Sequence, residues 1–277
     1  AVGALNDVAK SEDCTIVQRA GIAGVEGSNE VQVKSSSGAT GEAFDQAYTC
    51  VNIAMDTPDY LYESHEDKTW LVPLSSTGEF NQVAIEWYTR EDSNGAIVGN
   101  PGGNVSDLPP RTSWGNISVI PGVPSSVSAP PVIRAQVITP GDQIDLAALD
   151  ATGRTVFVRP TAVSTGVIKP VDIPIDLAGS PRVVSDGATG VNSLYPVTCS
   201  ATFLHNDEYS CRTVLILDGS VSESASRNAF LRLSSIYSGA HVRVTLLNTA
   251  NPIFFHGVQP SVDSTGRANN LFRRVEA

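Results

Sequence analysis

Short segments rich in β-branched and aromatic residues recur along most of the chain, and turn-forming residues separate them. This pattern is typical of β-strands joined by turns, because an amphipathic helix repeats its apolar residues every third or fourth position. We expect strands at Tyr48–Met55, Thr69–Pro73, Gln82–Thr89, Ile117–Ile120, Val132–Thr139, Thr155–Val158, Val197–Leu204, Arg212–Leu217, Phe230–Ile236, His241–Leu247 and Pro252–Val258. Many short strands at this spacing predict antiparallel β-sandwich-like modules.

The start of the chain shows a helical pattern instead. From Leu5 to Ala23, apolar residues fall near helical spacing among charged and amide side chains. Gly21, Gly24 and Gly27 follow, and glycine is common just past a helix end but costs stability inside a helix. We therefore expect a mainly β chain with one N-terminal α-helix.

Turn-forming residues also mark candidate boundaries between modules. Pro, Gly, Ser or Asn crowd three stretches, which are Ile97–Arg111, Pro121–Pro131 and Pro160–Pro196. Prolines in the last stretch argue against a long central strand, since proline cannot donate a ladder hydrogen bond. We expect a helical segment at 1–28, a first β module at 29–166 and a second β module at 167–277, with the boundary near Val167.

Two dipeptides, Asn94-Gly95 and Asp218-Gly219, predict hairpin turns, because Asn, Asp and Gly tolerate the positive φ of such turns. Asp92 with Asn94 and Gly95 also resembles a fragment of a calcium loop. The bidentate Glu of such a loop does not follow at the required place, so a plain turn is the favoured interpretation.

The chain is acidic, with 18 Lys and Arg against 29 Asp and Glu and a formal net charge of −11. Nucleic acid and anionic lipid both require clustered cations, so we expect neither as a partner. The acidic residues are scattered, which is typical of a solvated surface. No stretch reaches the roughly 20 apolar residues of a membrane span, so we expect no membrane contact by this sequence.

Four cysteines form two pairs along the sequence, Cys14 with Cys50 and Cys199 with Cys211. Disulfides within each half are the natural expectation in an oxidising compartment, although four cysteines allow three connectivities. Cys199 and Cys211 also flank His205, which permits a zinc interpretation. Because neither thiol belongs to a C-x-x-C pair, we favour the disulfide.

The sequence nominates no catalytic centre. Its histidines, His65, His205, His241 and His256, are far apart in the sequence, and no nucleophile elbow, P-loop or H-E-x-x-H motif is present. We therefore expect a protein that is not an enzyme and that needs no cofactor and no metal. A secreted hydrolase would require two carboxylates at the separation used by glycosidases, and no pair stands out.

Aromatic residues offer candidate ligand contacts. A platform that stacks on the apolar faces of sugars could be formed by Trp70, Trp87, Trp114, Tyr60 and Tyr62, if they share one exposed surface. Trp87 lies inside an alternating strand, so we expect it in the core.

Several motifs resemble prepilin-like proteins of type IV pili, especially a divergent class from candidate-phylum bacteria. In the second half they are Ala229–Leu233, Ser235–Tyr237, Val242–Thr245 and Val262–Val275, of which the last is the most specific. In the first half they are Asp13-Cys14, Gln18–Ala20, Tyr48–Val51 and Ile85–Trp87. The resemblance touches most of the chain as scattered motifs.

This resemblance implies an α+β pilin-like head, in which a helix leads into antiparallel sheet tied by disulfides and displayed on a secreted fibre. Such pilins assemble with other pilin subunits through an N-terminal apolar helix, which is missing here, so Leu5–Ala23 would be the lower part of that helix. Arg273 and Arg274 add positive charge near the C-terminus and are candidates for a contact with a neighbouring subunit.

We therefore expect a structural subunit of an extracellular type IV pilus that presents its head to a host or neighbouring cell. The alternative is a secreted carbohydrate-binding or adhesive β module without fibre assembly. Trp70, Trp114 or Tyr60 exposed on one concave face would favour that alternative.

Overall fold

The structure, a computed structural model, describes residues 31–32, 46–66, 68–94, 130–139, 153–164, 170–177, 194–200, 209–221, 229–268 and 271–276. Within these ranges the chain is mainly β-strand and contains no helix, which confirms the predicted mainly β class. The predicted helix at Leu5–Ala23 lies outside the described residues. None of the ranges above holds a helix with the length and hydropathy of a membrane span.

The chain divides into two compact units that interleave along the sequence. Unit 1 combines Ala1–Thr57 with Gln259–Ala277, and unit 2 is Pro58–Val258. Unit 2 is therefore an insertion, and both chain ends belong to unit 1. This division does not coincide with the predicted boundary near Val167, because strands from either side of that residue pair within the same sheets of unit 2.

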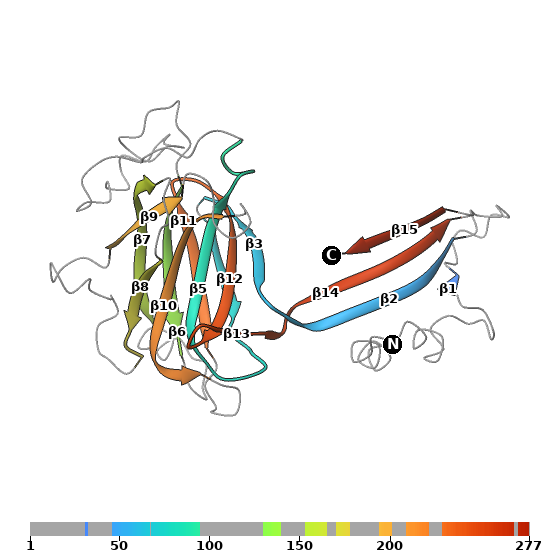
Figure 1. Cartoon of the computed structure of the whole chain (residues 1–277), viewed down its shortest axis with the longest axis horizontal. Helices are drawn as coiled ribbons and strands as arrows, with labels where there is room; N and C mark the ends of the chain where they lie inside the picture. Colours follow the sequence, from blue (N-terminus) through green and yellow to red (C-terminus); the bar gives the residue numbers. More distant parts are fainter. Residues whose placement is uncertain are drawn as a thin grey trace. The chain divides into compact units, whose positions relative to one another are not determined.

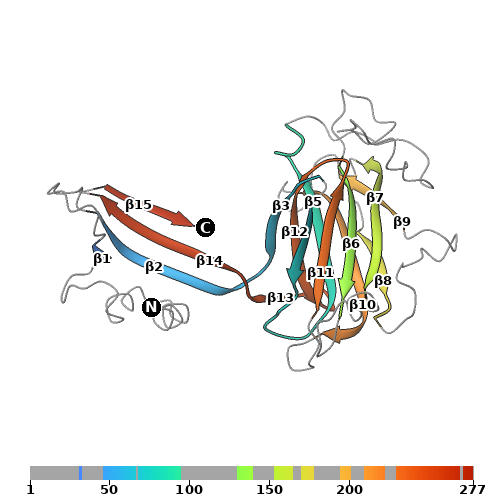
Figure 2. The ribbon, with the colours of Figure 1, turned by 180° about the vertical axis from the view of Figure 1, so that it is seen from behind.

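Unit 2 contains two sheets that lie face to face as two layers (Figures 1 and 2). The six-stranded sheet has the order β13-β12-β5-β10-β8, and β3 also pairs with β12. Its strands are β3 (Tyr60–Ser64), β5 (Phe80–Thr89), β8 (Val171–Ile175), β10 (Tyr209–Val221), β12 (Ala240–Asn248) and β13 (Asn251–Ile253). The five-stranded sheet has the order β4-β11-β6-β7-β9. Its strands are β4 (Thr69–Pro73), β6 (Val132–Ile138), β7 (Arg154–Ser164), β9 (Leu194–Ser200) and β11 (Phe230–Ile236).

The two layers share one core because every second side chain of a strand points to the same face. Ile85 and Trp87 of β5 are fully buried, and they join the same apolar cluster as Leu231 and Leu233 of β11 in the opposite sheet. The predicted core position of Trp87 is confirmed. Its indole Nε1 donates a hydrogen bond to the Pro131 carbonyl at 3.1 Å, which satisfies the one polar atom that the side chain carries into the core.

Two edge strands pair in parallel, whereas the other described pairs of unit 2 are antiparallel. β8 runs parallel to β10, and β9 runs parallel to β7. Each of these edge strands contains a proline, Pro174 in β8 and Pro196 in β9, and an edge strand tolerates the missing donor. Pro160 lies inside β7 where the register against β9 shifts. The proline-rich stretch therefore still contains short strands.

The turn predictions have different outcomes. Asn94 lies in a turn after β5 with a φ of 50°. The predicted hairpin at Asp218-Gly219 is wrong, because both residues lie inside β10, where the register against β5 is irregular between Ile216 and Val221. The irregular register there accommodates additional residues of β10, as a β-bulge does.

The described strands at the two ends of the chain form a four-stranded sheet in the order β1-β2-β14-β15 (Figure 1). These strands are β1 (Val31–Gln32), β2 (Gln46–Thr57), β14 (Phe255–Ala268) and β15 (Leu271–Glu276). β1 is antiparallel to β2, and β15 is antiparallel to β14. Segments from both chain ends therefore build one sheet.

Candidate functional site

Three aromatic residues connect the edges of the two sheets of unit 2. Tyr60 and Tyr62 belong to β3 of the six-stranded sheet, and Trp70 belongs to β4 of the five-stranded sheet. The Tyr62 and Trp70 rings stack with 6.2 Å between centroids and 11° between planes. The Trp70 Nε1 donates a hydrogen bond to the Tyr60 hydroxyl at 2.5 Å. These three residues, here called the aromatic edge, close one side of the sandwich.

The aromatic edge only partly fits the predicted sugar platform. Tyr60 is only 8% exposed and packs near Phe255, so it belongs to the core. Trp70 is 50% exposed and keeps one ring face supported by Tyr62. Trp114 lies outside the described residues. The structure therefore leaves Trp70 as the exposed aromatic candidate, with Tyr62, another residue of the predicted platform, as its supporting partner.

Tyr62 has an unusual environment. Its hydroxyl oxygen is buried and has no hydrogen-bond partner among the described residues. Burial, followed by the neighbouring Tyr60, raises the pKa of Tyr62 well above its ordinary value. Tyr62 therefore stays neutral at physiological pH and contributes a ring surface.

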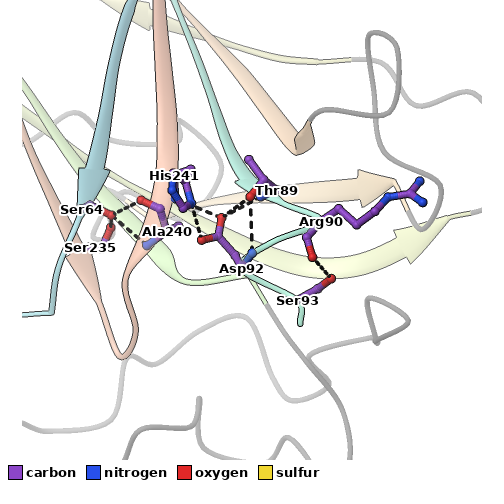
Figure 3. Close-up of polar contacts among 8 residues, drawn as sticks. All are labelled: Ser64, Thr89, Arg90, Asp92, Ser93, Ser235, Ala240 and His241. Atoms are coloured by element: carbon purple, nitrogen blue, oxygen red, sulfur yellow. Dashed lines mark hydrogen bonds and ion pairs between the residues drawn. The ribbon is translucent and has the colours of Figure 1, made fainter. Parts of the chain in front are cut away.

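A second group of polar residues gathers around Asp92, in the turn after β5 (Figure 3). Asp92 Oδ2 accepts hydrogen bonds from the Thr89 backbone N–H at 2.7 Å and from the His241 backbone N–H at 2.9 Å. The Thr89 hydroxyl lies 3.1 Å from the same oxygen. Asp92 Oδ1 lies 2.8 Å from His241 Nδ1. The carboxylate thus fastens the end of β5 to the start of β12.

The charge on His241 depends on this carboxylate. Burial alone would lower the pKa of His241, but the hydrogen bond and charge of Asp92, together with Glu63 and Glu91, raise it above the ordinary 6.5. The raised pKa favours the protonated imidazole, and in that form His241 and Asp92 are an ion pair. The His241 side chain is 35% exposed, so solvent screens the pair.

Ser64 lies beside this group but is occupied by structural contacts (Figure 3). Its hydroxyl lies 2.6 Å from that of Ser235, donates to the Ala240 carbonyl at 2.7 Å and accepts from the Ala240 N–H at 3.0 Å. A Cβ added at Gly239 would approach the Ser64 carbonyl oxygen to 2.5 Å, so glycine permits the close passage of the chain there. Although Ser, His and Asp occur together, Ser64 is buried and hydrogen-bonded to neighbouring strands, which favours a fastening role.

A third charged group lies in the middle of the six-stranded sheet. Glu86 is 4% exposed and is paired in register with Arg212 of β10 and Arg243 of β12. Arg243 Nε donates to Glu86 Oε2 at 2.8 Å, and Arg212 Nε lies 3.7 Å from Oε1. The Arg243 guanidinium also lies 4.7 Å from the centre of the Tyr209 ring. One buried carboxylate is thereby held between two cations.

The predicted disulfide in the second half of the chain is confirmed. Cys199 of β9 and Cys211 of β10 are bonded and fully buried, so the bond joins the two sheets and leaves neither thiol for zinc. Cys14 lies outside the described residues, so the pairing of Cys14 with Cys50 stays a prediction. In the described part of the chain, no three His, Cys, Asp or Glu residues gather as a metal site.

Arg273 and Arg274, the predicted subunit contacts, lie in β15, where the structure describes the strand but not their side chains.

The contact between Asp92 and His241 was not predicted from the sequence, because 149 residues separate the two residues. A local signal existed in Thr89 and Asp92, since an Asp three residues after a strand-ending Thr commonly accepts backbone hydrogen bonds in a turn.

Comparison with known proteins shows no relative, since no family model, no curated protein and no solved structure matches the chain. The family resemblance read from the sequence motifs therefore stays an expectation.

Proposed function

We propose that the protein is a structural subunit of a type IV pilus and that unit 2 is its extracellular head, presented for adhesion, motility or cell–cell contact. The division of the chain carries this proposal. Both chain ends belong to unit 1, and the sandwich is inserted between them. A subunit that assembles through an N-terminal helix can thus keep its head as a separate compact unit.

The resemblance motifs add support at the same place. The most specific motif, Val262–Val275, covers the second half of β14 and most of β15 in the four-stranded sheet of the chain ends. In the proposal, this sheet follows the predicted N-terminal helix and forms the α+β part of the pilin. Other pilin subunits are the expected partners, and Arg273 and Arg274 of β15 stay candidates for that contact.

The construction of unit 2 suits a head exposed outside the cell. Its two layers share a core, and the Cys199–Cys211 disulfide joins them, which an oxidising compartment permits. In this account its ion pairs hold strands together, and no residue acts on a substrate.

The first test is to label the surface of the organism that encodes the chain with gold-conjugated antibodies against the full chain. The proposal expects label along fibres or at their tips, and loss of that label when the gene is deleted. Label confined to the cytoplasm, or secreted protein with fibres left unlabelled, would contradict it.

The precursor sequence upstream of Ala1 supplies an independent test. A basic leader ending in a small residue, followed by about 20 apolar residues, would support the pilin proposal. A conventional signal peptide cleaved just before Ala1 would contradict it.

A secreted adhesive module is the second candidate, favoured by the half-exposed Trp70 stacked on Tyr62. It predicts that the chain binds sugars and that Trp70→Ala abolishes this binding. Leu61→Ala, which removes a half-exposed apolar side chain from β3, is the control. Unchanged sugar binding by Trp70→Ala would contradict the sugar platform.

A further inference from the structure

The five-stranded sheet of unit 2 has an unusual charge distribution for so acidic a chain. Its described strands contain no Asp or Glu, yet they contain Arg134 in β6, Arg154 and Arg159 in β7, and Arg232 in β11. The described strands of the six-stranded sheet contain four carboxylates, which are Glu63, Glu86, Asp172 and Asp218. The described strands of the five-stranded sheet therefore carry arginines without carboxylates, whereas those of the six-stranded sheet carry four carboxylates together with Arg212 and Arg243.

Two of these arginines lie on the outer side of the five-stranded sheet. In β11, Leu231 and Leu233 point into the core, so the alternate residue Arg232 points outward. Arg134 alternates in the same way with buried neighbours in β6. Arg232 pairs in register with Gln136, two residues from Arg134, so the two guanidinium groups are diagonal neighbours.

These arginines are not neutralised within the described structure. Neither Arg134 nor Arg232 forms an ion pair with a described carboxylate, and the Nε of Arg134 and the Oε1 of Gln136 are buried without hydrogen-bond partners. Burial, followed by the charge of Arg232, lowers the pKa of Arg134. A carboxylate that a partner places beside the partly exposed side chains of Arg134 and Arg232 would relieve the repulsion between these like charges.

The neighbouring edge strand adds apolar surface. Leu71 of β4 is paired in register with Arg232 and is 51% exposed. Arginine is enriched at protein interfaces, where it often supplies much of the binding energy. The surface formed by Arg134, Gln136, Arg232 and Leu71, here called the arginine face, therefore favours a protein partner over a small free anion.

The opposite sheet of unit 2 carries the complementary charge. Asp172 of the edge strand β8 is exposed and alternates with the buried Ile173 and Ile175, so it points away from the core. Asp218 of the neighbouring β10 is also exposed. A second copy of this chain therefore offers carboxylates on the side of its sandwich that lies opposite its own arginine face.

We propose that the arginine face of one head binds the acidic β8–β10 edge of a second copy of this chain. Because the two surfaces lie on opposite layers of the sandwich, the contact is head to tail, and such contacts propagate into filaments or close into rings. The inference rests on the proposed function, since a fibre holds neighbouring heads at high effective concentration, where a weak contact suffices.

The test measures binding of the full chain in solution to the same chain immobilised at high density. Wild-type protein should bind, and binding should weaken as ionic strength rises. Arg232→Glu should bind about tenfold more weakly. The control is Arg90→Glu, which makes the same charge change in the turn after β5 and should bind like wild type.

Charge reversal on the acidic side sharpens the test. Immobilised Asp172→Arg should bind wild type more weakly and should recover part of the binding of Arg232→Glu. Arg232→Gln provides a milder variant should the reversal disturb folding, and thermal unfolding of each variant checks that point. Equal binding by Arg232→Glu and Arg90→Glu would overturn the proposal.

Two other outcomes separate the hypotheses. Arg232-dependent binding to a sulfated polysaccharide, with no binding to a second copy, would overturn the proposed partner. Gold-labelled fibres whose heads show no self-binding would contradict this inference alone. Self-binding by a protein that is absent from fibres would contradict the pilus proposal and leave the contact standing.

Discussion

The two sheets of unit 2 differ in whether their arginines have carboxylate partners. The six-stranded sheet holds Glu86 between Arg212 and Arg243, whereas Arg134 and Arg232 of the five-stranded sheet have no carboxylate partner among the described residues. Burying a charge is costly unless an opposite charge or hydrogen bonds compensate. We infer that Glu86 and its two arginines serve the fold, and that Arg134 and Arg232 are available to a partner.

Because charge differs between the two sheets, the net charge of the whole chain does not exclude a partner for a single sheet face. A formal charge of −11 argues against polyanionic partners for the whole chain. It does not describe a single sheet face, because exposed charges are screened beyond about 10 Å at moderate salt. Local charge decides short-range recognition.

The largest expected change in stability tests whether the disulfide between the two sheets stabilises unit 2. Replacing both cysteines, Cys199→Ala with Cys211→Ala, should lower the free energy of unfolding by about 3 kcal/mol, because the unfolded chain regains the freedom that the cross-link removed. Urea unfolding at equilibrium measures the change. Substitution is preferable to a reductant, since it leaves Cys14 and Cys50 untouched. A loss below about 1 kcal/mol would contradict a role for this bond in holding the layers together.

The next effect tests the paired charges of the six-stranded sheet. Glu86→Gln should lower the free energy of unfolding by about 2–3 kcal/mol, because Arg212 and Arg243 would face each other without a buried carboxylate. The control is Asp172→Asn, which neutralises an exposed carboxylate of the same sheet and should change stability by less than about 0.5 kcal/mol. Equal effects of the two substitutions would remove the contrast between the sheets.

Sequence reasoning succeeded where the information is local. The enrichment in β-branched and aromatic residues predicted the strands Thr69–Pro73 and Phe230–Ile236 with the bounds that the structure shows, and Trp87 was placed correctly in the core. The contacts that form between segments far apart in the sequence were not predicted. The register of β3 against β12 buries Tyr60, and the turn after β5 meets His241 only in the folded chain.

A smaller effect concerns pH and the pair of Asp92 with His241. The folded-state pKa of His241 lies above the 6.5 of the unfolded chain, so the pair contributes fully below pH 6.5 and loses its contribution as pH rises through the folded-state value. We expect the free energy of unfolding to fall by up to about 1 kcal/mol as pH rises above 6.5 and through the folded-state pKa, a modest change because the imidazole is partly solvated.

His241→Gln should flatten this pH dependence, and urea unfolding across the pH series measures it. His65→Gln removes an exposed histidine from the end of β3 and should leave the slope as in wild type. A wild-type slope in His241→Gln would show that other groups dominate the titration.

The smallest expected effect is the sharpest test of the comparison between the sheets. Arg232→Gln should change the free energy of unfolding by less than about 0.5 kcal/mol, because it removes a charge that has no described partner and relieves repulsion on Arg134. Arg243→Gln makes the same substitution in the other sheet and should cost about 2 kcal/mol, since it leaves Glu86 with a single, more distant arginine. If Arg232→Gln proved as costly as Arg243→Gln, the arginine face would be part of the fold, and its charges would not be free for a second head. If Arg232→Gln left the free energy of unfolding unchanged but weakened self-binding, Arg232 would contribute to recognition and not to stability.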